Sequence, residues 1–398
     1  MSSGRLWRVL VGVALAVAAF NLRPAVASIG PLLGDIRAGL PMSPTVAGLL
    51  TSVPPACFAV SGTVAPRLVR RVGPATVVWM AMAALALGLA GRALAGGSAV
   101  FLAASAAALA GIGIGNVVMP IVVKRYFPEH VGVMTGVYSM ALTLGASLAA
   151  AISVPLAEGL GGGWRVGLGF WAVPAAVAAL AWLVVRTPRD DPPTAATAAV
   201  VPAGRITSSP TAWALSVFFG LQAAGAYIVL GWLPQIFRDA GVAPATAGLL
   251  LALTPAVGIP LAFLMPTIAA RLPTQGPLAV ALSALGIAGY LGLWFVPATL
   301  PWLWALLLGV SQASFPLALT MIGLRSRSTR GVAQLSAFAQ GVGYLISIPG
   351  PILVGVLYDH TGGWTAPLAF MAALLVPQAV AGVLAGRDRF VESETVRA

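Results

Sequence analysis

One arginine lies inside an apolar stretch near the start of the chain. Residues 18–30, AAFNLRPAVASIG, carry Asn21, Arg23 and Pro24 among aliphatic side chains. A guanidinium keeps its charge at physiological pH and presents five donors in a planar fork, which suits planar or anionic groups. Pro24 removes one helical hydrogen bond, so we expect a kink at this point. We interpret Arg23 as a binding residue, with Asn21 as its polar neighbour.

Further polar side chains interrupt apolar stretches elsewhere. Asn116 and Gln312 each precede a proline by four residues, at Pro120 and Pro316, and Gln222 lies between leucine and alanine. Amide side chains donate and accept hydrogen bonds, which in membranes usually join two helices. Taken together, these amides indicate a polar ring around a pathway. Weaker candidates for the same ring are Gln340 and Tyr344, four residues apart, together with Tyr138 and Tyr227.

Residues typical of catalysis and metal binding are not grouped in this sequence. It contains no paired carboxylates, no nucleophile with an adjacent base and no phosphate-binding loop, so we expect no enzyme activity and no cofactor. His130 and His360 fall in predicted loops without ligand-like neighbours, which argues against a metal site. Cys57 is alone in the chain, so no internal disulfide can form.

The composition indicates which elements position these residues. The 398 residues are 59% hydrophobic and 8% charged, with a mean hydropathy of +0.96, whereas soluble domains are about 25% charged. Apolar stretches of about 20 residues recur along the chain, and each is long enough to cross a hydrocarbon core as a helix. The sequence therefore predicts an all-α protein of the lipid bilayer.

Twelve such spans are expected. They cover residues 9–33, 44–66, 75–95, 98–123, 131–157, 165–186, 210–234, 244–269, 276–297, 300–322, 331–357 and 365–386. The first resembles a signal peptide, but because eleven spans follow it we interpret it as an uncleaved helix. An arginine in the membrane core costs about 2.5–3.5 kcal/mol on insertion scales. Arg23 must therefore face a wet cavity or partner groups, and the alternative to solute contact is an arginine that pins two helices together.

Basic residues are unevenly distributed between the predicted loops. Most of the 22 lie in segments that alternate with the loops holding Arg37, Arg92, Arg165 and Arg238. Positive charge collects in the cytoplasmic segments of membrane proteins, so we expect both termini in the cytoplasm and the protein in the cytoplasmic (inner) membrane. This bias accounts for the net charge of +12 and removes the case for nucleic-acid binding.

The two halves of the chain resemble each other at a constant offset. SPTVAGLL at 43–50 matches APATAGLL at 243–250, and GGW at 162–164 returns at 362–364. A register kept over this distance indicates duplication of a six-helix unit. We therefore expect an N-terminal six-helix bundle at 1–186, a cytoplasmic linker at 187–209, a C-terminal six-helix bundle at 210–386 and a cytoplasmic tail at 387–398.

Several stretches resemble the major facilitator superfamily of transporters. GTVAPRLVRR keeps Gly62, Arg67, Arg70 and Arg71 of the pattern G-x-x-x-D-R-x-G-R-(K/R) that follows the second span there. Pro66 replaces the aspartate of that pattern and Val69 its second glycine. The resemblance implies that the four retained residues form a gating loop. NLRPAVASIGPLL at 21–33 and AGLLTSVP at 47–54 are similar to the cyanate/2-nitroimidazole transporter family within that superfamily.

The resemblance implies a function as well as a fold. It implies two pseudo-symmetric six-helix bundles that work by alternating access, in a chain that acts as a monomer. Arg23, Asn116, Gln222 and Gln312 fall on the first, fourth, seventh and tenth helices, which line the central cavity in that superfamily. The implied substrate is a small anionic or electron-rich solute, such as cyanate or a nitroheterocycle. Two alternatives stay open: a broad-specificity drug efflux pump, in which Arg23 is structural, and a transport-inactive receptor.

Acidic residues bear on energy coupling. All ten fall in predicted loops, tails or span ends, with Asp35 and Glu158 at the outer ends of their spans. Proton-driven transporters usually carry Asp or Glu within the spans. We therefore expect no carboxylate relay in the bundle core, and transport by facilitated diffusion, by exchange, or by symport of a proton carried on the substrate.

Overall fold

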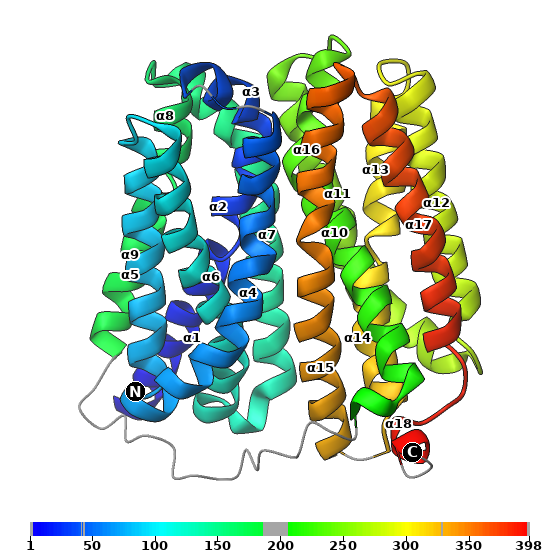
Figure 1. The fold of residues 1–398 in the computed structure, drawn as a ribbon. Coiled ribbons are helices and arrows are strands. Elements are labelled where there is room, and N and C mark those ends of the chain that lie inside the picture. Colours follow the sequence, from blue (N-terminus) through cyan, green and yellow to red (C-terminus); the bar gives the residue numbers. More distant parts are fainter. Residues whose placement is uncertain (1–2, 41, 43, 186–205, 328, 396–398) are drawn as a thin grey trace. The chain divides into compact units, whose positions relative to one another are not determined.

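The computed structural model describes residues 3–40, 42, 44–185, 206–327 and 329–395 (Figure 1). All elements in these ranges are helices. The α-helices are α1 (Ser3–Asn21), α2 (Pro24–Ala27), α3 (Ile29–Gly39), α4 (Pro44–Val72), α5 (Pro74–Ala93), α6 (Ser98–Tyr126), α7 (Val131–Gly159), α8 (Gly163–Gly169), α9 (Ala172–Val185), α10 (Pro210–Asp239), α11 (Pro244–Arg271), α12 (Gly276–Phe295), α13 (Pro301–Ser311), α14 (Ser314–Leu324), α15 (Thr329–Ser347), α16 (Pro349–Thr361), α17 (Thr365–Ala385) and α18 (Val391–Thr395). Two short 3-10 helices, η1 (Pro128–His130) and η2 (Ile206–Ser208), complete the set.

The expected membrane spans are present in the structure. Within the described residues, 11 helical stretches are long and apolar enough to cross a bilayer, and they coincide with eleven of the twelve expected spans to within a few residues at each end. The remaining expected span, 44–66, falls inside α4, some of whose side chains lie outside the described residues. The chain is a multi-pass membrane protein with an all-helical fold.

Prolines break the first span twice. A proline has no N–H, and its ring collides with the carbonyl four residues earlier in a helix. The span is interrupted at Leu22 and Arg23, just before Pro24, and again at Ser28, three residues before Pro31. It therefore consists of α1, the single turn α2 and α3. The kink predicted at Pro24 is confirmed.

The tenth span is broken in the same way, whereas the fourth is not. α13 ends at Ser311 and α14 begins at Ser314, with Pro316 in its first turn. Pro120, in contrast, lies inside the unbroken helix α6. The two prolines that occupy related places in the repeat therefore have different effects on the backbone.

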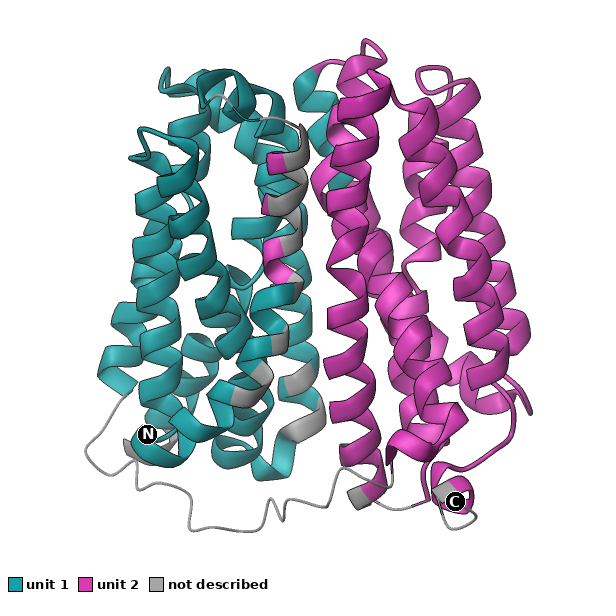
Figure 2. Ribbon diagram, in the orientation of Figure 1, with its two compact units in different colours: residues 1–42, 56–197, 244–252 teal, residues 43–55, 198–243, 253–398 magenta. Residues whose placement is uncertain are grey.

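The chain divides into two compact units (Figure 2). Unit 1 comprises Met1–Met42, Ala56–Thr197 and Pro244–Ala252, and unit 2 comprises Ser43–Pro55, Ala198–Ala243 and Leu253–Ala398. The main division falls inside the segment expected to be the linker. The first parts of α4 and α11 are grouped with the other half of the sequence, which the repeat did not predict. The bundle boundaries at 186 and 210 stay predictions.

Small residues allow close helix packing inside each unit. In unit 1, α5 packs against α6, α8 and α9, and a Cβ atom at Gly111 of α6 would lie 2.5 Å from the carbonyl oxygen of Ala81 in α5. In unit 2, α10 packs against α15 and α17, and α12 against α13 and α17. A Cβ atom at Gly220 of α10 would lie 2.8 Å from the carbonyl oxygen of Gly343 in α15. These glycines let the backbones approach within contact distance.

The C-terminal tail folds back onto unit 2 as the short helix α18. The Glu394 carboxylate accepts hydrogen bonds from the Ser209 hydroxyl at 2.5 Å, the Thr211 hydroxyl at 2.8 Å and the Thr211 N–H at 3.2 Å. Ser209 is the N-cap of α10, and a carboxylate is favourable at the positive end of a helix. Glu394 therefore completes the first turn of α10.

Arg325 joins the ends of three helices in unit 2. The residue is 2% exposed and donates to the carbonyls of Ala385 and Gly386, both at 3.1 Å, and to the side-chain oxygen of Gln275. It also pairs with the exposed Asp388 at 3.3 Å. Burial lowers the pKa of the Arg325 guanidinium from its usual value, and Asp388 opposes that shift. The ends of α14, α12 and α17 are thereby held together.

Candidate functional site

Arg23 lies where the first span is broken. It is the N-cap of α2, with φ −122° and ψ −31°, and Pro24 follows it. A residue before proline is disfavoured in the α region, which explains why α1 ends here. The Arg23 side chain is partly buried, and among the described residues no hydrogen bond or ion pair ends on it. Its planar fork of donors is therefore not used by the described part of the protein, and a part in binding stays a prediction.

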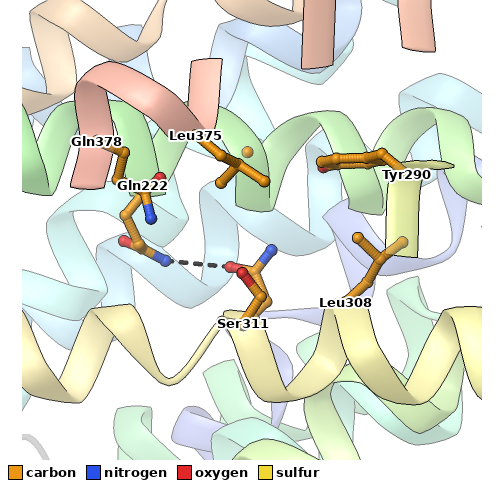
Figure 3. Close-up of a pocket in the computed structure, with 8 residues that line it drawn as sticks. Gln222, Tyr290, Leu308, Ser311, Leu375 and Gln378 are labelled. Carbon is orange, nitrogen blue, oxygen red and sulfur yellow. Dashed lines mark hydrogen bonds between the residues drawn. The ribbon is translucent and has the colours of Figure 1, made fainter. Parts of the chain in front are cut away.

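Gln222 and Gln312 meet at a small pocket inside unit 2 (Figure 3). The Nε2 atom of Gln222 donates to the Oε1 atom of Gln312 at 3.2 Å. The structure therefore brings together two of the amides that the sequence singles out. The pocket has a volume of about 10 Å³, about enough for one water molecule. Its lining comes from α10, α12, α13 with the residue that follows it, and α17, and consists of Gln222, Gly225, Tyr290, Leu308, Ser311, Gln312, Leu375 and Gln378.

Hydrogen-bonding capacity in this pocket is only partly used. Gln222 is 5% exposed, and its Oε1 atom is buried without a partner in the described structure. Gln378 reaches the Ser314 hydroxyl at 3.4 Å, which is a long hydrogen bond. A buried polar atom without a partner costs about 1–3 kcal/mol. A donor entering the pocket, from water or from a solute, would therefore be stabilised by Gln222.

The sequence of the whole chain places it among known transporters. The sequence model of the Major Facilitator Superfamily matches residues 9–348 of this chain. The chain belongs to this superfamily. Over 382 residues it is 38% identical to the uncharacterized transporter YycB of Bacillus subtilis, covering 95% of this chain and 94% of that one. It is 33% identical to the 2-nitroimidazole transporter of Escherichia coli (96% of each chain) and to the cyanate transport protein CynX of the same organism (91% and 93%).

Solved structures agree with this assignment. A bacterial homologue of the human lysosomal transporter Spinster matches with a TM-score of 0.79 at 17% identity, covering 95% of this chain and 96% of that one. A D-xylose–proton symporter matches with a TM-score of 0.74 at 16% identity, covering 94% and 96%. At these identities the similarity establishes the fold alone. The major facilitator fold predicted from the sequence is confirmed, and members of this superfamily are transporters, not enzymes.

The repeat-related polar residues of this superfamily member differ in their backbone setting. In the first half, Arg23 lies at a break, and Asn116 lies on the unbroken helix α6. In the second half the order is reversed, because Gln222 lies on the unbroken α10 and Gln312 between α13 and α14. Asn116 is partly buried, and its side chain makes no hydrogen bond among the described residues.

Asn21 is engaged with the backbone of unit 1. The residue is 1% exposed, and its Nδ2 atom donates to the carbonyls of Val17 at 2.8 Å and Pro174 at 3.1 Å. The amide group therefore donates once within α1 and once across to α9. A role in binding solute stays a prediction, and any such role would have to use the Asn21 carbonyl oxygen.

The weaker candidates do not line the pocket. Gln340 donates to the Ser336 hydroxyl at 2.7 Å, one turn earlier on α15. Tyr344 packs edge-on against Phe219 of α10, with ring centroids 5.2 Å apart. Tyr227 is 5% exposed in α10, and Tyr138 is partly buried in α7. Their part in binding stays a prediction.

The loop motif of the superfamily lies at the end of α4. The side chains of Arg67, Arg70 and Arg71 are exposed there, whereas the surroundings of Gly62 lie outside the described residues. The gating role that the motif implies stays a prediction.

The position predicted for Arg92 from the sequence is wrong. It was expected in an outer loop, but it lies in the last turn of α5 and is 0% exposed. Its Nε atom donates to the Ser105 hydroxyl at 2.8 Å, and its Nη1 atom donates to the Ala25 carbonyl at 2.6 Å. An arginine at the end of an apolar stretch is typical of an interfacial anchor, so the sequence offers no signal for this burial.

Proposed function

We propose that this superfamily member carries a small anionic or electron-rich solute across the cytoplasmic membrane by alternating access of its two halves. Arg23 is the observation that carries the proposal. It is a permanent cation in the first span, at a helix break, with no partner among the described residues. A cation kept in a membrane span at such cost is expected to face a wet path or a ligand.

Two relatives support the proposed class of solute. One is named for 2-nitroimidazole and the other for cyanate. A nitro group and a cyanate ion both offer electron-rich oxygen or nitrogen atoms to a donor, and both match the fork of donors that a guanidinium presents. The amides of Gln222 and Gln312 would add uncharged donors and acceptors that orient the solute.

The proposal is tested with purified protein and with proteoliposomes. Cyanate and 2-nitroimidazole are added in a thermal-shift assay, and their uptake is measured. We expect one of them to raise the melting temperature of the wild type and to leave Arg23→Gln unchanged. Arg23→Lys keeps the charge but loses the planar fork, so uptake should fall by about tenfold or more while the yield of folded protein stays normal.

Two outcomes would contradict this assignment. Normal uptake by Arg23→Lys would exclude recognition by the planar fork. Failure of both Arg23 variants to fold would show that the residue pins helices together. The matched control is Arg165→Gln, which removes an exposed arginine of the same unit that donates to the Ala95 carbonyl at 3.2 Å and should leave uptake unchanged.

Broad drug efflux is the second candidate function. It is favoured by the lining of the pocket in unit 2, which combines amides with Tyr290, Leu308 and Leu375 and carries no charge. Transport of apolar cationic dyes by the wild type and by Arg23→Gln at equal rates would support efflux over the primary proposal.

We also propose that both termini lie in the cytoplasm, because the basic residues collect in the segments on that side. In a Cys57→Ala chain, a cysteine at Gly162 should react with impermeant thiol reagents in intact cells. A cysteine at Arg389 should be shielded, and its labelling from outside would reverse the proposed orientation.

A further inference from the structure

Arg92 is a fully buried cation without an acidic partner in the described part of the chain. Its Nε and Nη1 atoms each make one hydrogen bond, and its Nη2 atom is buried without any. The ring of Phe101 lies 5.9 Å from the guanidinium carbon. A buried charge is costly unless it is paired. If this place served packing alone, an apolar residue would be the more stable choice.

The acceptor that Arg92 uses in the first span belongs to the single turn α2. In a continuous helix, the Ala25 carbonyl would accept from the N–H of Ile29. Ser28 interrupts the helix, so that bond is missing, and Arg92 supplies a donor in its place at 2.6 Å. The Ser28 hydroxyl is itself buried without a partner. Arg92 therefore satisfies a buried carbonyl of α2 that lacks its helical donor.

The same turn fixes the backbone of Arg23. The N–H groups of Val26 and Ala27 both donate to the Arg23 carbonyl at 3.0 Å. The turn α2 is flanked by breaks in the helix, at Leu22 and Arg23 on one side and at Ser28 on the other. The backbone of Arg23 is thus hydrogen-bonded to α2.

We propose that Arg92 is a positioning residue that holds α2, and through α2 the guanidinium of Arg23, in the orientation that binds solute. The proposal rests on the proposed function in so far as Arg23 contacts the solute. Arg92 itself contacts Ser105, Phe101 and the backbone of α2, and it needs no contact with the solute.

Hydrogen–deuterium exchange tests the structural part without any solute. In Arg92→Gln, the amides of residues 22–28 should exchange at least about tenfold faster than in the wild type, because one hydrogen bond to a charged group is lost. The rest of α1 and α3 should exchange as before. Arg165→Gln, at the same side of the unit, should leave residues 22–28 unchanged. Wild-type exchange in Arg92→Gln, or equally fast exchange in Arg165→Gln, would overturn the proposal.

Uptake kinetics test the functional part, with cyanate and 2-nitroimidazole as probes. A misdirected Arg23 weakens binding, so KM should rise by about tenfold in Arg92→Gln while the maximal rate changes little. Arg92→Lys keeps the charge but offers a single donor nitrogen in place of the two that Arg92 uses, and it should restore part of the affinity. A lowered maximal rate with an unchanged KM would contradict a positioning role.

The exchange and uptake measurements together distinguish failure of this inference from failure of the proposed function. If the wild type transports neither probe, the proposed function fails, and the exchange of residues 22–28 still decides whether Arg92 holds α2. If Arg92→Gln does not fold, hydrogen–deuterium exchange is measured in Arg92→Lys instead. The lysine side chain cannot donate to both Ser105 and Ala25 in the geometry of the guanidinium. Faster exchange in that variant supports the proposal, and unchanged exchange overturns it.

Discussion

The side-chain amide of Gln222 donates to the side-chain oxygen of Gln312 at 3.2 Å and so joins the seventh span to the tenth inside unit 2. The bond runs from an unbroken helix to a residue at a proline-induced break. It therefore joins a continuous helix of the unit to an interrupted one.

Replacing either glutamine should be worse than replacing both. Gln312→Leu leaves the buried amide of Gln222 without its acceptor, which should destabilise the protein by about 1–3 kcal/mol. Gln222→Leu with Gln312→Leu removes both partners and should recover part of that loss. A double-mutant cycle on thermal unfolding measures the coupling. Strictly additive effects would show that the bond contributes nothing to stability.

Gly145 and Gly136, both in α7, form a matched pair. A Cβ atom at Gly145 would lie 2.1 Å from the Phe20 carbonyl oxygen, whereas one at Gly136 meets nothing within 4 Å. Gly145→Ala should destabilise the protein by about 1–3 kcal/mol through overpacking and should also reduce uptake, because Phe20 lies three residues before Arg23. Gly136→Ala should be neutral or stabilising by up to about 1 kcal/mol. Equal melting temperatures for the two variants would contradict this close contact.

The tail should contribute measurably to the stability of unit 2. Glu394→Gln keeps the shape of the side chain but removes the charge at the start of α10, and we expect a loss of about 1 kcal/mol. Glu129→Gln is the control, since Glu129 is exposed in η1 and should be neutral. Thermal unfolding in nanodiscs is the measurement. No difference between the two variants would mean that the bonds of Glu394 are offset by solvent.

Energy coupling should not depend on a carboxylate in the membrane core. Arg92 and Arg325 are the charged residues among the buried polar side chains of the described chain, and no Asp or Glu is buried there. Replacing Asp35 by Asn or Glu158 by Gln should therefore leave gradient-driven uptake within about twofold of the wild type. The measurement is uptake into proteoliposomes, with and without a pH gradient, of a solute that does not titrate in this range. Accumulation that one of these substitutions abolishes would establish a carboxylate relay.

Much of the fold follows from the sequence, because span length and proline position act locally. Twenty apolar residues cross a membrane as a helix, and Pro24 interrupts the first span as its missing N–H predicts. Gln222 and Gln312, both named from the sequence as members of a polar ring, form a hydrogen bond with each other in the structure. The position of a proline does not predict every break, because Pro120 lies inside α6 and that helix stays continuous.

Other features depend on contacts between distant segments and gave no local signal. Arg92 at a span end is typical of an anchor at the membrane surface, and only Ala25 and Ser105 in space reveal its burial. Gln378 and Tyr290 of the pocket were likewise missed, because neither has a counterpart in the repeat. The attachment of the tail was not predicted, because nothing in the sequence around Glu394 marks Ser209 and Thr211 as its partners.

The bonds of Glu394 to Ser209 and Thr211 have a consequence for biosynthesis. The partners are 185 and 183 residues apart in the chain, so they enclose nearly all of the second half. Segments made early can fold while the ribosome is still at work, but the start of α10 acquires its carboxylate only after the whole second half, up to Glu394, has been translated. A chain that terminates early would lack this closing contact and would present an unfinished helix end to the proteases that remove incomplete products.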